Sequence, residues 1–532
     1  MKRTSFIILL CLTVLLHLPG RAQEPYSWGD WERWGQQPDS TYLNPVIPAD
    51  FSDLDCIRVG DDYYAITSTF QFSPGVTIIH SRDLVNWEYC GHAVPDLTQI
   101  GPELGHDRMN RYGRGIWAGS IRYHQGRFYL FFGTPDEGFF MTSAPSAEGP
   151  WEPLTVLLAE PGWDDCSAIW DEDGNGYFVG TCFKDGYKTY IFRMRADGRS
   201  IDRDSAVLVN SGSGREANKL IRHGAYYYLV FSESSGRGRY VLAKRSRNIM
   251  GPYLEERQLA HPSREAREPN QGGIVEGPDG KWYFFTHHGT GDWGGRIASL
   301  LPVTWTGDWP IIGEIQPDGL GAMQWRGGMP ALTEEVLRLT RSDDFDSGTV
   351  APQWQWNYQP RDEMFSLSER PGWLRLKAFR PLREDDLMSA GNTLTQRTFH
   401  SKYNDVTIKL DLDGLTPGQH AGLCHFSKEH AALGVEYIQD GDEGIFLEFR
   451  KNGSVVRGPR ISSRYLWLKS RWGNDGVSHF YFSVDGDGFT AFGQEYQMKF
   501  GSYRGDRIGI YTYNNQAEAG YVDVDYLHYR ME

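Results

Sequence analysis

The chain has 532 residues, with 54 Lys and Arg against 69 Asp and Glu and a formal net charge of −15. Its length allows two or three domains with full cores. The acidic balance argues against a protein that binds nucleic acid or anionic lipid through general electrostatics. Aromatic residues make up 14% of the chain, including 18 Trp, and such side chains suit both packing in β-sheets and stacking on sugar rings.

Residues 1–22 are predicted to form a cleavable signal peptide. Lys2 and Arg3 precede an apolar run, Phe6–Leu18, and the small residue Ala22 marks the expected cleavage site. The run is too short to span a bilayer comfortably, and no second apolar run of that length follows. We therefore expect a secreted or periplasmic protein without a membrane span. A retained anchor is the alternative.

Five segments share one pattern, an apolar start followed by a polar turn with Gly and then an aromatic strand. They start at Ile57, Ile121, Ile169, Leu220 and Ile274. Each segment has the strand composition and turn chemistry of a β-hairpin. A four-stranded unit repeated at about 50 residues is typical of a β-propeller. The sequence therefore predicts a five-bladed β-propeller over residues 40–325, with a β-sandwich that has long loops as the alternative.

Carboxylates recur at one position of this repeat. Four residues before the five starts stand Asp53, Trp117, Asp165, Glu216 and Asn270. The innermost strand of each propeller blade runs along the central channel, so we expect the three acids to meet at one end of that channel. Clustered carboxylates repel one another, which indicates chemistry or cation binding. Solvated turn residues are the alternative.

Paired carboxylates on two sides of a pocket are the machinery of glycosidic bond cleavage. One, protonated, gives its proton to the leaving oxygen, while the other, ionised, activates water or attacks the anomeric carbon. A third carboxylate raises the pKa of the acid by like-charge repulsion. A structural Ca²⁺ site is the competing use of such a cluster.

Several motifs resemble those of glycoside hydrolase family 43, the β-xylosidases and α-L-arabinofuranosidases. They include NPVIPADFSDLDCIRVGDDYY, GIWAGSIRYHQGRFYLFFG, GWDDCSAIWDEDGNGYF, REANKLIRHGAYYYLVFSES and LLPVTWTGDWPIIG, and the resemblance covers Leu43–Gly313. It implies that Asp53 is the general base, Glu216 the general acid and Asp165 the residue that orients the acid and modulates its pKa. It also implies an inverting reaction that needs no cofactor.

The chain departs from the family pattern around these acids. Ser52 and Leu54 stand where the family has prolines beside the base, and Cys166 replaces the proline after Asp165. Glu216 is followed by Ala-Asn instead of Gly-Pro or Ala-Pro. Because no acid is lost, we expect these changes to affect substrate preference more than activity.

Further substrate-binding candidates are Trp117, Arg296, Phe70 and Phe72. Trp117 is expected to form a pocket wall for a sugar face, with core packing as the alternative. Arg296 resembles a substrate-contacting arginine of the family, with a structural ion pair as the alternative. The two phenylalanines are expected to line the entrance, against ordinary packing within a blade.

Two neighbouring histidines, His287 and His288, lie in the fifth repeat. The family often has a channel histidine near a bound cation, so they are the candidates for a metal ligand. A hydrogen-bonded core histidine is the alternative.

The blade pattern stops near residue 325, and residues 326–340 read as a linker. Short alternating strands then predict an antiparallel β-sandwich over residues 341–532. This segment resembles the concanavalin-like, jelly-roll domain attached to many β-xylosidase-type members of the family. The resemblance implies a domain that packs on the propeller and lends a loop to the active-site rim, with a carbohydrate-binding module as the alternative. Acids near its ends, offered as Ca²⁺ ligands or as solvated turn residues, are Asp343, Asp344, Asp523 and Asp525.

The sequence thus predicts an exported, exo-acting glycosidase. Its expected substrates are fragments of xylan, arabinoxylan or arabinan, from which it would remove terminal β-D-xylosyl or α-L-arabinofuranosyl units. The alternative is a propeller lectin that binds glycans without cleaving them. Retention of all three acids argues against a pure binder, which has no need of a repelling cluster.

Overall fold

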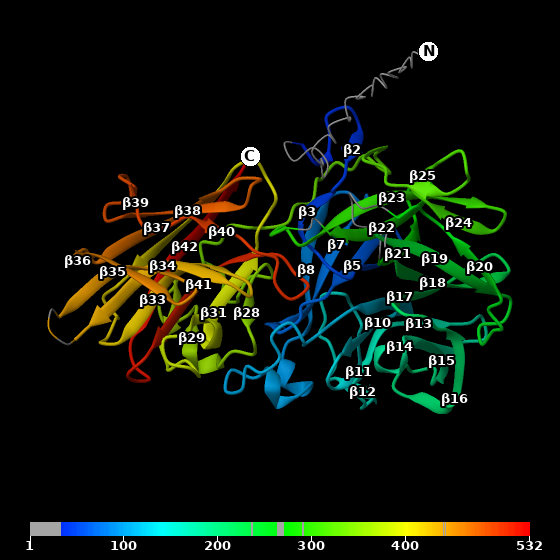
Figure 1. Ribbon diagram of the computed structural model, residues 1–532, viewed down its shortest axis with the longest axis horizontal. Helices are drawn as coiled ribbons and strands as arrows, with labels where there is room; N and C mark the ends of the chain where they lie inside the picture. The colour runs from blue at the N-terminus through cyan, green and yellow to red at the C-terminus, as the bar shows by residue number, and fades with distance from the viewer. Residues whose placement is uncertain (1–32, 236–237, 263–270, 290–291, 440, 442) are drawn as a thin grey trace, which may run out of the picture.

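The computed structural model describes residues 33–532, apart from 236–237, 263–270, 290–291, 440 and 442 (Figure 1). Within these residues the regular elements are β-strands and five short 3₁₀ turns, which confirms the all-β prediction. The predicted signal peptide and Asn270 lie outside the described residues. Among the described residues, no helix is long and apolar enough to cross a membrane.

Four-stranded antiparallel sheets follow one another along residues 55–312 (Figure 1). The first contains β4 (Asp55–Val59), β5 (Asp62–Thr67), β7 (Gly75–Ser81) and β8 (Trp87–Val94). The second contains β9 (Gly119–His124), β10 (Arg127–Thr134), β11 (Gly138–Ala144) and β12 (Thr155–Leu158). The third contains β13 (Trp163–Trp170), β14 (Gly176–Cys182), β15 (Lys188–Met194) and β16 (Ile201–Asn210).

The last two sheets of the propeller complete the series. The fourth contains β17 (Arg215–His223), β18 (Tyr226–Ser235), β19 (Gly238–Ser246) and β20 (Glu255–Gln258). The fifth contains β21 (Gly272–Glu276), β22 (Trp282–Gly289), β23 (Arg296–Thr306) and β24 (Trp309–Ile312). Each predicted repeat start falls in the first strand of one of these sheets, so the repeat in the sequence marks the inner strands of the blades.

The ring is closed where the fifth sheet meets the first. β3 (Ile47–Asp50), which precedes the first blade, pairs with β23 of the fifth sheet. On the inside, Gly273 of β21 lies against Cys56 of β4, where a Cβ atom would fall 2.4 Å from the Cys56 backbone nitrogen. Only glycine permits this close approach of the two backbones.

The C-terminal domain is a sandwich of two sheets (Figure 1, left). In pairing order, one sheet contains β36 (Ser454–Ile461), β35 (Gly444–Lys451), β34 (His430–Ile438), β33 (Gln419–Phe426), β41 (Arg507–Asn514), β31 (Asn392–Arg397) and β28 (Gln355–Asn357). The other contains β29 (Phe365–Ser366), β30 (Leu374–Lys377), β42 (Tyr521–Met531), β32 (Asn404–Asp411), β37 (Tyr465–Trp472), β38 (Val477–Ser483) and β39 (Thr490–Ala491). Inward-facing aliphatic residues such as Ile408, Leu423 and Ile510 form the buried core.

The propeller and the sandwich share backbone pairing. β6 (Phe72–Ser73), in the first blade, pairs with β28 and so extends a sandwich sheet. β27 (Arg326–Gly328) pairs with β2 (Thr41–Leu43), so the first residues of the predicted linker lie against the propeller. These pairings hold the second domain in one orientation beside the first.

The central channel is filled at the end that lies beyond β4 residue Asp55. Asp55 is 1% exposed and accepts hydrogen bonds from the Ile121 amide, at 3.0 Å, and from the Arg122 guanidinium, at 2.6 Å. Arg122 also bonds Ser167 on the third blade, and the Lys219 ammonium donates to the carbonyl of Gly119. This cluster joins the inner strands of four blades across the channel.

Candidate active site

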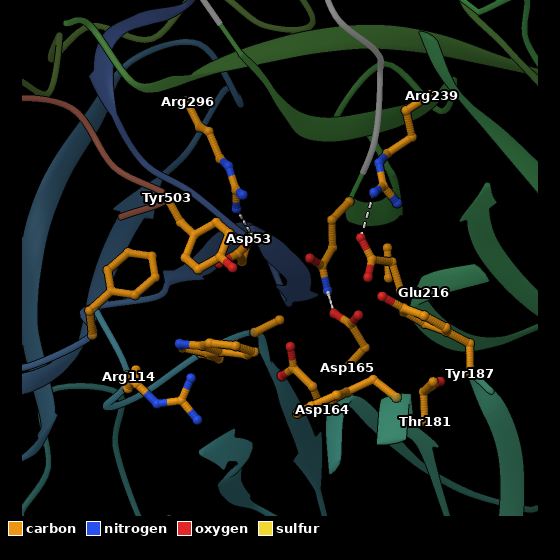
Figure 2. A pocket seen from close by; sticks show the side chains of 16 residues that line it. Asp53, Arg114, Asp164, Asp165, Thr181, Tyr187, Glu216, Arg239, Arg296 and Tyr503 are labelled. Carbon is orange, nitrogen blue, oxygen red and sulfur yellow. Dashed lines mark hydrogen bonds and ion pairs between the residues drawn. The ribbon is translucent and has the colours of Figure 1, made fainter. Parts of the chain in front are cut away.

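A cavity of about 390 Å³ lies at the other end of the channel, where Asp53, Asp165 and Glu216 converge (Figure 2). These acids are 112 and 51 residues apart along the chain. The predicted candidates among its lining residues are Asp53, Phe70, Trp117, Asp165, Glu216 and Arg296. The propeller repeat therefore does bring the three acids to one place, as expected.

A β-bulge positions the acids in the third and fourth blades. Between the pairs Asp164–Thr181 and Ser167–Val179, two residues of β13 oppose one residue of β14. The same interruption lies between the pairs that Glu216 and Lys219 make with β18. Such bulges bend a strand and re-aim its side chains, and they are common beside active sites.

Left-handed backbone marks the same point in three blades. Asp53, Asp165 and Ala217 have φ values of 56°, 51° and 67°. Non-glycine residues adopt this conformation at a cost of about 1–3 kcal/mol and do so mainly at functional sites. The strained residue is the acid itself in the first and third blades, but it follows Glu216 in the fourth.

The count of equivalent positions is therefore wrong by one residue in the fourth blade. By backbone register Glu216 matches Asp164, and Ala217 matches Asp165. The repeat in that blade starts at Ile221, not at Leu220. Register was not visible in the sequence because Leu220 and Ile221 are both apolar.

Asp53 is held from three sides. Its Oδ1 pairs with the Arg296 guanidinium at 2.6 Å, and its Oδ2 accepts a hydrogen bond from the Ser68 hydroxyl at 2.6 Å. Its backbone amide donates to Nδ1 of His287 at 2.8 Å. The side chain is 11% exposed, so the carboxyl borders the cavity while both of its oxygens contact protein donors.

Asp165 is buried and lines the cavity between the other two acids (Figure 2). The side-chain amide of Gln271 donates to its Oδ1 at 2.9 Å. Burial raises the pKa of Asp165, and the charge of Asp53 raises it further, whereas the Ala217 amide, the Lys219 ammonium and Gln271 lower it. This carboxyl is placed to act on its neighbours through charge.

Glu216 pairs with the Arg239 guanidinium at 2.6 Å. Burial raises the pKa of Glu216, and the negative charge of Asp165 raises it further. Arg239 and Arg296 act in the opposite direction and do not cancel the effect. A carboxyl that keeps its proton more firmly than usual suits a general acid.

A fourth carboxyl, which the sequence argument missed, lines the same cavity. Asp164 precedes Asp165, and Figure 2 shows both carboxyls directed into the space between Asp53 and Glu216. Burial raises the pKa of Asp164 well above its ordinary value, and the charges of Asp165, Asp53 and Glu216 add to the shift. The Asp-Asp pair in WDDC was the available signal.

Aromatic side chains form one wall of the cavity. The Trp117 indole nitrogen donates to the Gly113 carbonyl at 2.9 Å, which fixes the ring. Tyr503, from a loop of the C-terminal sandwich, packs edge-on against Trp117 at 5.7 Å between ring centroids. The Arg296 guanidinium lies 5.8 Å from the Tyr503 centroid. The sandwich thus contributes a side chain to the rim of the site.

Phe70 and Phe72 have different surroundings. Phe70 lines the cavity and forms a β-bridge with Ile116. Phe72 is fully buried in β6 and packs edge-on against Phe426 of the sandwich at 6.5 Å, below the guanidinium of Arg504. The expectation that Phe72 lines the entrance is wrong, because the pairing of β6 with β28 buries this side chain between the two domains.

The two histidines bond protein atoms. His287 accepts from the Asp53 amide, and its pKa is held well below the ordinary value by burial and by the Arg296 charge. His288 Nδ1 lies 3.0 Å from the Ser299 hydroxyl. Both rings are fully buried. His287 therefore supports the backbone of the predicted base.

The predicted Ca²⁺ ligands contact protein donors instead of one another. Asp523 pairs with Arg370 and Arg375, and Asp525 pairs with Lys409. Asp343 accepts from the Trp354 indole, and Asp344 pairs with His528. Within the described part of the chain, no group of three or more His, Cys, Asp or Glu is arranged to hold a metal ion, so the Ca²⁺ expectation finds no support here.

Comparison with known families identifies the protein family that carries this arrangement of acids. The family model described as "Glycosyl hydrolases family 43" matches residues 42–310. The chain belongs to this family. A second model, described as "Beta xylosidase C-terminal Concanavalin A-like domain", matches residues 342–530. Both predicted resemblances are confirmed, and the protein is a glycosidase.

Relatives in family 43 share most of the chain. A β-xylosidase of Formosa agariphila is 32% identical over 545 residues, covering 93% of this chain and 91% of its own. A non-reducing end α-L-arabinofuranosidase of Bacteroides ovatus is 29% identical over 365 residues, covering 63% of this chain and 65% of its own. The crystal structure of a GH43 protein mutant from Bacillus licheniformis superposes with a TM-score of 0.79 at 27% identity, covering 92% of this chain and all of that one.

Proposed function

We propose that this family 43 glycosidase removes terminal β-D-xylosyl or α-L-arabinofuranosyl units from fragments of xylan, arabinoxylan or arabinan, with inversion at the anomeric carbon. The names of the relatives support the two sugar classes, since one is a β-xylosidase and another a non-reducing end α-L-arabinofuranosidase. The two sugars present similar hydroxyl patterns, so one pocket is able to take either.

The proposed reaction uses two of the four carboxyls directly. Asp53 takes a proton from a water molecule, whose oxygen attacks the anomeric carbon. The bond from that carbon to the leaving oxygen breaks, and Glu216 gives its proton to this oxygen. Attack from the face opposite the leaving group inverts the configuration, and it requires room for the water between the two carboxyls, typically about 6.5–9.5 Å.

The observation that carries this proposal is the contrast between Asp53 and Glu216 across one cavity. Both acids pair with an arginine, but at Glu216 burial and the charge of Asp165 still raise the pKa. When the surroundings of two carboxyls give them different pKa values, the one with the higher pKa is the acid and the other is the base. Asp165 then serves as the residue that keeps Glu216 protonated and oriented.

Exo action is part of the proposal, and the side chains below the cavity support it. Below the cavity, hydrogen bonds among Asp55, Arg122, Ser167, Lys219 and their neighbours cross the axis and give the pocket a floor. A pocket that is blind on this side accepts the end of a chain more readily than its middle. The Trp117 and Tyr503 rings at the wall offer faces on which a sugar can stack.

Export is part of the same proposal. Lys2 and Arg3 followed by the apolar run Phe6–Leu18 have the arrangement of a signal peptide. Cleavage after Ala22 would release the enzyme to the periplasm or the medium, where plant glycans are met. The mass of the mature protein purified from its native host tests this point.

The test of function is turnover of a panel of aryl glycosides that includes β-D-xyloside and α-L-arabinofuranoside, by wild type and by Glu216→Gln. Release of one sugar by the wild type, with loss in the mutant, would identify the sugar and the acid. Proton NMR of the first product then reports its anomeric configuration. Glycan binding with no release from any glycoside would favour the lectin alternative.

A further inference from the structure

Asp164 stands apart from the other three carboxyls by its lack of a compensating side chain. Asp53 pairs with Arg296, Glu216 pairs with Arg239, and Asp165 accepts from Gln271, as the dashed contacts in Figure 2 show. Among the described residues, no Lys or Arg pairs with Asp164, and its buried Oδ1 has no hydrogen-bond partner.

The position of Asp164 in β13 directs its side chain toward the cavity. Asp164 holds the same place before the bulge of β13 that Glu216 holds before the bulge of β17. Both side chains line the cavity from neighbouring blades. On its other side Oδ1 faces Gly133, where a Cβ atom would lie 3.3 Å away. Oδ1 is therefore enclosed by protein on this side and finds no donor there in the residues that the structure describes.

The charges around Asp164 favour its neutral form. Burial is the main cause of its raised pKa, and the facing acids Asp165, Asp53 and Glu216 add to it, whereas the Asp165 backbone amide acts in the opposite direction without cancelling the shift. The other charged group on this side of the cavity, Arg114, is engaged in a two-point ion pair with Asp136. Asp165, its closest competitor for a proton, has the attraction of Lys219 and two hydrogen-bond donors that favour its ionised form.

We propose that Asp164 is a neutral sugar-binding residue, whose protonated carboxyl donates a hydrogen bond to a hydroxyl of the terminal sugar. A protonated carboxyl offers one O–H donor together with an acceptor, which matches a sugar hydroxyl that both accepts and donates. An ionised carboxylate would only accept. This assignment rests on the proposed function for the identity of the sugar, though not for the contact itself.

The experiment measures the affinity of D-xylose and of L-arabinose by calorimetry for wild type, Asp164→Ala and Asp164→Asn. Loss of one neutral hydrogen bond in Asp164→Ala is expected to weaken binding by roughly tenfold. Asparagine keeps a donor and an acceptor without a charge, so Asp164→Asn is expected to restore most of that loss. Asp173→Ala, an exposed acid in the same blade, is the matched control and should bind as the wild type does.

The pH dependence of binding supplies a second readout that does not depend on the alanine variant being stable. Wild-type affinity should fall as the pH rises through the pKa of Asp164, because the donor is lost and a charge is gained. In Asp164→Asn this fall should be reduced. Equal affinity in wild type and Asp164→Ala would overturn the assignment, and so would an Asp164→Asn variant as weak as the alanine variant.

Failure of this inference and failure of the proposed function give different results. If the wild type hydrolyses no aryl glycoside but binds one of the sugars in a manner that depends on Asp164, the contact stands and the proposed reaction falls. If hydrolysis is present while sugar binding ignores Asp164, the reaction stands and the contact falls. Absence of binding to both sugars by the wild type also overturns the contact.

Discussion

The two ends of the central channel are lined by the same inner strands and use their carboxyls in opposite ways. Asp55 is buried at the filled end and is satisfied by a guanidinium and a backbone amide. Asp53, two residues earlier, stands in the cavity with Asp164, Asp165 and Glu216 around it. At the filled end the Asp55 carboxyl is paired, while the open end gathers four carboxyls, of which two pair with arginines.

This difference separates a structural acid from a chemical one. A buried carboxyl with a complete set of partners serves the fold, because removing either partner leaves a buried group uncompensated. Carboxyls that share a site with too few cations have shifted pKa values and exchange protons in the range that catalysis needs. Proximity in sequence says little about which role a residue takes.

Among the changes considered, replacement of the general base Asp53 should produce the largest effect on activity. We expect Asp53→Asn to lower kcat by about 10²–10⁴-fold on an aryl glycoside, since general base catalysis contributes about that much. Steady-state kinetics with the released aryl alcohol as the signal would measure it. The circular dichroism spectrum should match that of the wild type, and a kcat within a few-fold of wild type would remove Asp53 from the mechanism.

The matched change two residues along should act on stability instead. Asp55→Asn leaves the buried Arg122 guanidinium without its carboxylate, and breaking a buried pair in this way costs about 3–5 kcal/mol. Denaturant unfolding followed by Trp fluorescence would show the loss. The kcat of the folded fraction should stay close to that of the wild type, and an intact stability would mean that the filled end does not join the blades.

The pH profile tests the role of Asp165. Its charge raises the pKa of Glu216, and the acid must be protonated, so activity falls as the pH rises through that pKa. Asp165→Asn removes the charge, lowers the pKa of Glu216 and should move the alkaline limb of kcat/KM to lower pH. Asp173→Asn, an exposed change in the same blade, should leave the limb in place. An unmoved limb in Asp165→Asn would contradict charge coupling between the two acids.

The smallest expected effect concerns the residue that the sandwich lends to the site. Tyr503→Ala removes a ring on which the sugar is proposed to stack, a contact taken as about 0.5–1.5 kcal/mol, the value for an aromatic pair. We expect KM to rise by roughly 2–12-fold, the equivalent of that energy, with little change in kcat. Tyr503→Phe keeps the ring and is the control. A KM unaffected by the alanine change would limit the sandwich to a supporting role.

The sequence alone determined the all-β fold, the family and three of the four acids in the cavity. The aromatic hairpins recur at a regular spacing, and this period is written in local strand and turn chemistry. The acids before Ile57 and Ile169 are equivalent by backbone conformation as well as by count. The fold, the repeat and these acids could be predicted because each depends on residue types at fixed separations in the sequence.

Tertiary structure alone decided register, burial and the contact between domains. The bulge in β17 gives Glu216 the same register position as Asp164 in β13. No residue type in β17 indicates this one-residue shift of register. Phe72 does not lie at the entrance, because a sandwich strand pairs with β6. Tyr503 lines the pocket although its loop lies more than 280 residues beyond Glu216 in the chain. These features depend on which backbone groups meet across long separations, and that is settled only when both domains have packed.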